Sequence, residues 1–241
     1  MLWLVGVGVW EPKDMSIKAY DVLQNADEVY LEDYTAHTFI NASTLSDYLG
    51  REVKALAREE VEDFSWLLEK AKNKNVALAV KGDVFAATTH YELYRSAVAS
   101  GIRTKVVHGS SVFSAIGKIG LSLYKYGRVA SLPHPNLFPS YPSSPFQIIQ
   151  ENLQAGMHTL VLLDIKMHLI DGLELISKHL DVSKLVGCYA LGSDEEKIAY
   201  GSFRDLRSYF KNVGNYASCI VVPGKLEFYE EDALKLWNIS D

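Results

Sequence analysis

The sequence predicts an α/β protein, because short apolar runs of strand length alternate with segments of helical periodicity. The clearest strand is the unbroken apolar run Val76–Val80, and helical spacing follows it from Tyr91 to Ala99. Short connections rich in glycine and polar residues separate most of these segments. A repeated strand-helix-strand order of this kind predicts a mainly parallel sheet with helices on both faces.

The first half of the chain supplies most of this pattern. Asp14 or Ser16 is placed to cap a helix with an apolar face on Ile17, Tyr20 and Leu23. A further helix is expected from Val61 onward, ending at residues 73–75. Strands are expected at residues 2–9, 28–31, 53–56, 76–80 and 103–107, with 53–56 as an edge strand. The 241 residues suffice for two domains of modest size, and we expect them at 1–108 and 109–241.

The second half is predicted to be α/β as well. It opens with a helical pattern on Val112, Ala115, Ile116, Ile119 and Leu123. Five of the seven prolines lie in the stretch 133–145, so no regular element is expected between Gly127 and Pro145. Helices are then predicted at residues 146–155, 173–180, 205–209 and 230–237, and strands at 159–165, 186–191, 197–203 (exposed) and 218–222.

Composition and charge exclude several classes of protein. The net charge of −6 opposes broad affinity for nucleic acid, which needs a basic surface. No apolar run approaches the roughly 18 to 20 residues that cross a bilayer, and the first residues lack the pattern of a signal peptide. Cys188 and Cys219 are far apart in sequence and form no disulfide framework, so we expect a cytoplasmic protein. Histidine and cysteine spacing gives no metal-site motif, and no metal is expected.

The stretch Lys81–His90 is the strongest candidate for a ligand-binding turn. Gly82 allows close backbone approach, Asp83 can accept hydrogen bonds, and Thr88 and Thr89 offer hydroxyl donors. The alternative is an ordinary strand-to-helix loop in which Asp83 or Thr88 caps the helix.

A second polar turn, His108–Ser111, also follows a strand and precedes a helical pattern. Its hydroxyls can cap that helix or donate to a ligand carboxylate. Ligands of open α/β sheets bind outside the carboxyl ends of the strands, so the two turns together favour a binding site.

Other motifs are incomplete. Gly6-Val7-Gly8 begins a dinucleotide fingerprint, but Glu11 stands in place of its third glycine. No nucleophile elbow supports Ser-His-Asp catalysis. His90 and His158 lie beside strand ends and are interpreted as hydrogen-bonded structural residues, and Asp164 as a cap or loop residue.

Blocks of sequence along nearly the whole chain, in order, resemble the diphthine synthase family of tetrapyrrole-methylase-like methyltransferases. The blocks are Leu4–Gly8, Glu28–Glu32 with Tyr34 and Thr35, Gly82–Asp83 with Ala87–His90, His108 with Ser111–Ala115, Gly120–Leu121 with Leu123–Gly127, Glu151–Leu153 with Gly156 and His158–Lys166, and Val221–Leu226. The resemblance implies two α/β domains with S-adenosylmethionine in the cleft between them, and a homodimer.

The resemblance also implies which residues contact the cofactor: Val9, Asp83, Ala86, Ser111, Val112, Leu163, Leu191 and Ser218. Asp83 is expected to accept from a cofactor hydroxyl or ammonium, and Leu163 and Leu191 to wall the adenine. Two positions depart from the family pattern. Val84 replaces the proline of the usual Gly-Asp-Pro, and Ser218 stands where relatives often carry histidine. The region 167–191 is also shortened.

The implied activity is methylation of the amino group of the modified histidine of elongation factor 2, a step of diphthamide synthesis. The residues identify no dedicated base, although Asp164 and His108 are candidates. Two alternatives stay open: a methylase of corrin or porphyrin precursors with the same fold, and a catalytically silent cofactor-binding protein.

Overall fold

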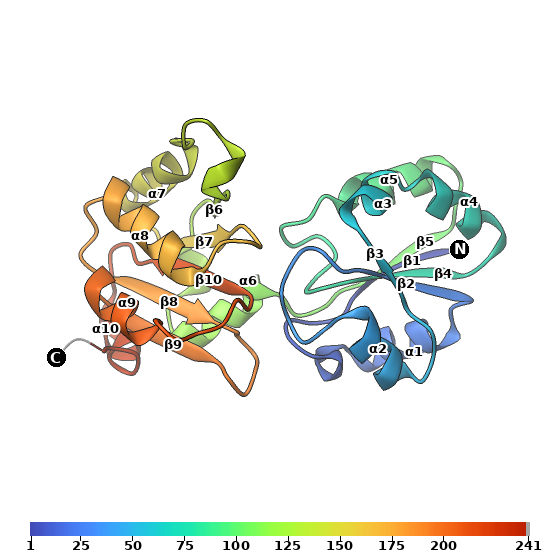
Figure 1. The fold of residues 1–241 in the computed structure, drawn as a ribbon, viewed down its shortest axis with the longest axis horizontal. Helices are drawn as coiled ribbons and strands as arrows, with labels where there is room; N and C mark the ends of the chain where they lie inside the picture. The colour runs from blue at the N-terminus through green and yellow to red at the C-terminus, as the bar shows by residue number, and fades with distance from the viewer. Residues whose placement is uncertain (240–241) are drawn as a thin grey trace. The chain divides into compact units, whose positions relative to one another are not determined.

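The computed structural model describes residues 1–239 and divides the chain into two compact units (Figure 1). The first unit is Met1–Ala115, and the second begins at Ile116. The sequence had suggested a division after residue 108. The turn at His108–Ser111 and the short helix after it therefore lie in the first unit.

The first unit contains a five-stranded sheet in the order β3-β2-β4-β1-β5, and every pair of neighbours is parallel. This confirms the predicted parallel sheet and the edge position of residues 53–56. The central strands are buried because apolar residues occupy both of their faces, as in Val76–Val80. The strands are β1 (Leu2–Gly6), β2 (Glu28–Glu32), β3 (Lys54–Leu56), β4 (Val76–Val80) and β5 (Thr104–Val107).

Helices cover both faces of this sheet (Figure 1). On one face, α1 (Ile17–Asn25) and α2 (Ala42–Leu49) contribute Leu23 and Leu45 to one core cluster. On the other, α4 (Ser65–Asn73) and α5 (His90–Ala99) contribute Leu67 and Leu93 to a second. Ser16 caps α1 by accepting from the amide of Ala19. Of the two predicted caps, Asp14 and Ser16, the second is therefore correct.

The helix predicted from Val61 is two helices, α3 (Arg58–Glu62) and α4. The break falls at Asp63, whose backbone angles are not helical and whose carboxylate accepts from the hydroxyl of Ser65 at 2.7 Å. Local competition of this kind leaves the apolar spacing unchanged, so periodicity alone did not reveal the break.

The second unit contains a mixed five-stranded sheet in the order β6-β7-β10-β8-β9. Only β6 and β7 are parallel, whereas β10 runs antiparallel to both β7 and β8, and β8 to β9. Cys188 and Cys219 are register partners on β8 and β10, and both are buried free thiols. The strands are β6 (Ala130–Leu132), β7 (Thr159–Leu163), β8 (Leu185–Tyr189), β9 (Lys197–Gly201) and β10 (Ser218–Val222).

Three predictions for this half were wrong. β6 occupies part of the segment where no regular element was expected, because its three residues end just before Pro133. β9 is not exposed, since Ile198 and Ala199 are buried. The helix predicted through Leu123 is only α6 (Val112–Ala115) and a 3-10 turn that ends at Ile119.

Gly120 ends that segment in the left-handed region, with φ of +91°. A Cβ at this position would lie 2.4 Å from the Cβ of Ala233 on α10 (Phe228–Lys235). Glycine is therefore required both by the backbone conformation and by the close approach of α10. The remaining helices of the second unit are α7 (Ser144–Gln154), α8 (Leu169–His179) and α9 (Phe203–Tyr209), all near their predicted positions.

Candidate functional site

The carboxyl ends of β1 and β4 form the topological switch point of the first sheet. β1 leads to α1 on one face, and its neighbour β4 leads to α5 on the other (Figure 1). When the chain leaves two adjacent parallel strands toward opposite faces of the sheet, a crevice opens at the carboxyl ends of those strands. Ligands of this fold class bind in that crevice. The turns after β1, β4 and β5 meet at this edge.

The backbone contact between these turns depends on three glycines, Gly6, Gly82 and Gly109. A Cβ on Gly6 would lie 2.6 Å from the amide nitrogen of Gly109 and 2.7 Å from the carbonyl oxygen of Gly82. The amide of Gly82 also donates to the carbonyl of Gly8 at 2.7 Å. No residue with a side chain fits at Gly6 without moving backbone, so the edge presents main chain directly.

Asp83 joins two of these turns. Its Oδ2 accepts from the ring Nδ1 of His108 at 2.8 Å and from the amide of Gly109 at 3.1 Å. Its Oδ1 accepts from the amide of Phe85 at 3.0 Å. Burial raises the pKa of the Asp83 carboxyl, but these hydrogen bonds outweigh burial and lower it, so the group is ionised. Oδ1 retains capacity for a second donor.

The alternative of an ordinary capping loop is wrong for Asp83 and Thr88. The residue before α5 is Thr89, and it makes no side-chain capping bond. Thr88 instead donates its hydroxyl to the carbonyl of Val84 within the turn. Val84, the departure from the family's proline, is fully buried in the core beside β4. Its side chain anchors the turn by packing, where proline would anchor it by a fixed φ.

The same turn holds a residue in an unfavourable backbone conformation. Ala87 has φ of 58°, one of two non-glycine residues with positive φ among residues 1–239. The other is Ala190, with φ of 49°. Such residues cost about 1–3 kcal/mol each and concentrate at functional sites. Both are adjacent to predicted cofactor residues, Ala86 and Leu191.

The structure gathers the expected cofactor residues into two groups, one in each unit. In the first unit, Val9, Asp83, Ala86, Ser111 and Val112 all follow the carboxyl ends of β1, β4 and β5. Ser111 is buried, and its hydroxyl accepts from the amide of Phe113. It therefore caps α6, which has only four residues.

In the second unit, three expected residues lie where the central strands of the mixed sheet begin or end. They are Leu163 at the end of β7, Leu191 just after β8 and Ser218 at the start of β10. Ser218 pairs with Tyr189, near the carboxyl end of β8, and its neighbour Cys219 pairs with Leu162 on β7. Because β10 is antiparallel to both strands, its amino end lies beside their carboxyl ends. Strand direction thus brings together three residues that are scattered in sequence.

A buried charged cluster beside the switch point was missed. Glu32, at the end of β2, is fully buried, and its Oε1 accepts from the Thr35 hydroxyl and the Lys81 amide. Its Oε2 has no partner among residues 1–239. Lys81 pairs with Asp33 at 2.6 Å. Burial raises the pKa of Glu32 to about 7. The only sequence signal was a pair of acids after one strand and a lysine after its neighbour.

His158 confirms its interpretation as a structural histidine. Its Nδ1 accepts from the amide of Gly224, so Nε2 carries the proton that it donates to Glu230 at 3.0 Å. Asp164 also has the predicted loop role, because its Oδ1 accepts from the amide of Lys166. Within residues 1–239 there is no cluster of metal-ligating side chains and no helix able to span a membrane.

Comparison with known proteins identifies the family. The model of the Tetrapyrrole (Corrin/Porphyrin) Methylases matches residues 1–207. The chain belongs to this methylase family. Diphthine synthase of Methanocaldococcus jannaschii is 36% identical over 98% of each chain. That of Methanothermobacter thermautotrophicus is 38% identical over 97% of this chain and 94% of its own. A crystal structure of diphthine synthase superposes with a TM-score of 0.89 at 31% identity, covering 99% of this chain and 96% of the other.

These matches place the chain among the diphthine synthases of that methylase family, as its sequence blocks predicted. The chain is therefore a methyltransferase, and S-adenosylmethionine is its cofactor. The first unit fits such a cofactor in its donor and acceptor groups. An ionised acid with free acceptor capacity stands at an edge of bare glycine backbone, next to a strained turn. An ammonium or hydroxyl group is the complement of that acid.

Proposed function

We propose that this chain methylates the amino group of the modified histidine of elongation factor 2 in diphthamide synthesis. The observation that carries the proposal is the 36% identity to a diphthine synthase over 98% of both chains. The match extends over both units of the chain. It supports a shared substrate more strongly than a match to the methylase fold alone.

The proposed cofactor contacts are the eight residues expected from the sequence. Asp83 accepts from a hydroxyl or ammonium of S-adenosylmethionine, beside Val9, Ala86, Ser111 and Val112. In the second unit, Leu163 and Leu191 offer apolar surface for the adenine, and Ser218 lies at the same sheet edge. The convergence of each group on one edge of its own sheet supports this assignment.

Methyl transfer requires of the protein mainly that it position the cofactor and the amine. The cofactor supplies an activated methyl group on a sulfonium, and in-line displacement depends on holding the two partners in reach. The amine must be neutral to attack. His108 is a candidate acceptor for its proton. Its Nδ1 is hydrogen-bonded to Asp83, Nε2 has no hydrogen-bond partner within residues 1–239, and its side chain is 72% exposed.

The proposal includes a homodimer in the cytoplasm. Two segments of the second unit expose large apolar side chains, with Tyr124 98% and Phe228 79% exposed. A hydrogen bond between the Ser122 amide and Glu230 joins these segments. Exposed apolar surface of this kind supports association of two copies, which sedimentation of the purified protein would measure.

The testing experiment incubates the protein with labelled S-adenosylmethionine and elongation factor 2 that already carries the aminocarboxypropyl group on its histidine. We expect label on the factor and none on a tetrapyrrole precursor supplied as control substrate. Label on the tetrapyrrole alone would contradict the proposal and favour the corrin or porphyrin methylase alternative.

A further inference from the structure

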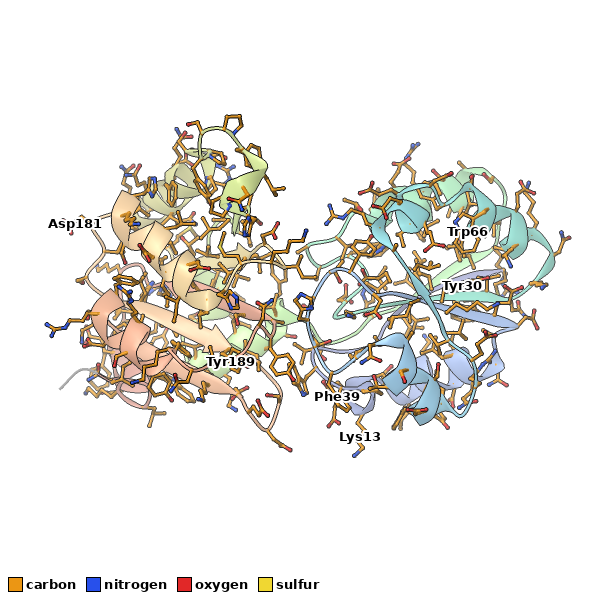
Figure 2. All side chains as sticks on the ribbon, in the orientation of Figure 1. Lys13, Tyr30, Phe39, Trp66, Asp181 and Tyr189 are labelled. Atoms are coloured by element: carbon orange, nitrogen blue, oxygen red, sulfur yellow. The ribbon has the colours of Figure 1, made fainter. Side chains whose placement is uncertain are left out.

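The first unit has a groove beside its edge strand β3, and we call it the edge groove. It is separate from the site where Gly6, Gly82 and Gly109 meet. Its volume is about 520 Å³, and its walls include the edge strand β3 and the segment that follows it. Tyr30 and Trp66 lie at its apolar side, with ring centroids 5.1 Å apart in an edge-to-face arrangement. Figure 2 labels both side chains. None of the expected cofactor residues lines this groove.

The backbone of β3 is open on the groove side. The carbonyl of Leu56 accepts from the amide of Asp33, so Leu56 bonds toward β2. In a parallel pair, alternate residues bond to the same neighbour, and the residue between them points its amide and carbonyl the other way. Ala55 is that residue, and it lines the groove. An added strand could therefore bond to Ala55 in the manner of β-augmentation.

The negative charge of the groove favours a positively charged ligand. Glu59, Glu60 and Asp63 line it against one cation, Lys54. Two of these carboxylates already have hydrogen-bond donors nearby. Glu60 accepts from the amide of Ala57, and Asp63 accepts from the hydroxyl of Ser65. Glu59 is exposed, and within residues 1–239 no hydrogen bond or ion pair occupies its carboxylate. Carboxylates beside aromatic rings complement a cationic side chain on an extended chain.

We propose that the edge groove binds an extended, arginine- or lysine-bearing segment of the protein substrate, which adds to the edge of β3. The naming of the substrate rests on the proposed function. The carboxyl ends of β3 and β4 point the same way, and only β2 separates them. Two strand spacings are roughly 10 Å. A substrate whose reacting residue reaches the turn at Asp83 can therefore place a flanking segment along β3.

The first test is independent of methyl transfer. The probe is a blocked five-residue peptide of alternating valine and arginine, titrated into the whole protein and followed by calorimetry. We expect Glu59→Lys to weaken its binding about tenfold. Asp21→Lys, the matched charge change on α1 across the sheet, should leave binding unchanged. Ala55→Pro should also weaken binding while the melting temperature stays the same, since the lost amide lies outside the sheet ladder.

Equal affinity of the wild type and Glu59→Lys for the peptide would overturn the proposal. So would equally tight binding of spermidine, because a free polyamine needs no sheet edge. The second test measures methylation of elongation factor 2. Glu59→Lys should raise KM for the factor several-fold, with kcat and cofactor Kd unchanged. If the factor is not methylated at all, the proposed function fails while peptide binding still decides whether the groove binds basic chains.

Discussion

The carboxylate of Asp83 and the imidazole of His108 form a hydrogen bond of 2.8 Å that links the turn after β4 to the turn after β5. The bond orients both groups at the edge where three glycines bring backbone into contact. Asp83 thereby has two roles. It holds the turns together through Oδ2, and it keeps acceptor capacity on Oδ1 for a cofactor.

Asp83→Ala tests the second role. We expect S-adenosylmethionine to bind more weakly by about 1.5–3 kcal/mol, the loss of a charge-assisted hydrogen bond. Calorimetric titration measures the affinity, and Asp83→Asn separates charge from shape, because it keeps the size of the side chain. Since Asp83 also joins two turns, a thermal melt must show that the variant is folded. Unchanged affinity in a folded variant would remove Asp83 from the cofactor site.

Ala87→Gly tests the strain in the same turn. A residue with φ of 58° is destabilised relative to glycine by about 1–2 kcal/mol, partly offset by the greater entropy of glycine in the unfolded chain. We expect the variant to be more stable by about 0.5–1 kcal/mol in urea unfolding. The neighbouring Ala86→Gly is the control and should lose stability, because Ala86 has no positive φ to relieve. A loss at both positions would show that Ala87 carries no strain.

Glu32 predicts a pH dependence of stability. Its folded pKa is raised from 4.5 to about 7, so the folded state holds the proton more tightly than the unfolded chain does. Stability from this group is complete below about pH 4.5 and falls as the pH rises toward 7, by at most about 3 kcal/mol. Glu32→Gln cannot ionise and should remove this slope. An unchanged slope between pH 5 and 7.5, measured by denaturant unfolding, would contradict the assignment.

Glu230 predicts the opposite dependence in the second unit. Burial raises its pKa, but hydrogen bonds from Lys125, two backbone amides and His158 outweigh burial and lower the pKa to about 2. Its stabilising effect is present above about pH 4.5 and is lost as the pH falls toward 2. Glu230→Gln leaves Lys125 without its buried partner, and we expect it to cost about 3–5 kcal/mol at pH 7. Acid unfolding that matches the wild type would show that the pair contributes little.

Much of the fold could be predicted from apolar pattern alone. Val76–Val80 was found because a strand buried on both faces has no polar residues to interrupt it. The three-residue strand β6 was missed, because its length is too short for a pattern and the prolines after it dominate the local signal. The break at Asp63 was missed because a local bond between the Ser65 hydroxyl and the Asp63 carboxylate leaves the hydrophobic spacing unchanged.

The candidate site was predictable only in part. Asp83 stood out because a second polar turn, His108–Ser111, follows another strand, and ligands of open α/β sheets bind beyond the carboxyl ends of the strands. The strain at Ala87 and Ala190 could not be seen, since alanine carries no sign of its own backbone angle. Nor could the burial of Glu32, because an acid at a strand end is usually exposed. These features depend on how distant turns meet, which a single sequence does not encode locally.

The most direct test of this methyltransferase is intact-mass spectrometry of elongation factor 2 after incubation with S-adenosylmethionine and the protein. The factor should start as the intermediate that carries the aminocarboxypropyl group. We predict mass increments of whole methyl groups, with fragmentation locating them on the amino group of the modified histidine. The increments should be strongly reduced with Asp83→Ala. An unmodified factor, in the presence of measurable cofactor binding, would contradict the account and leave a silent cofactor-binding protein.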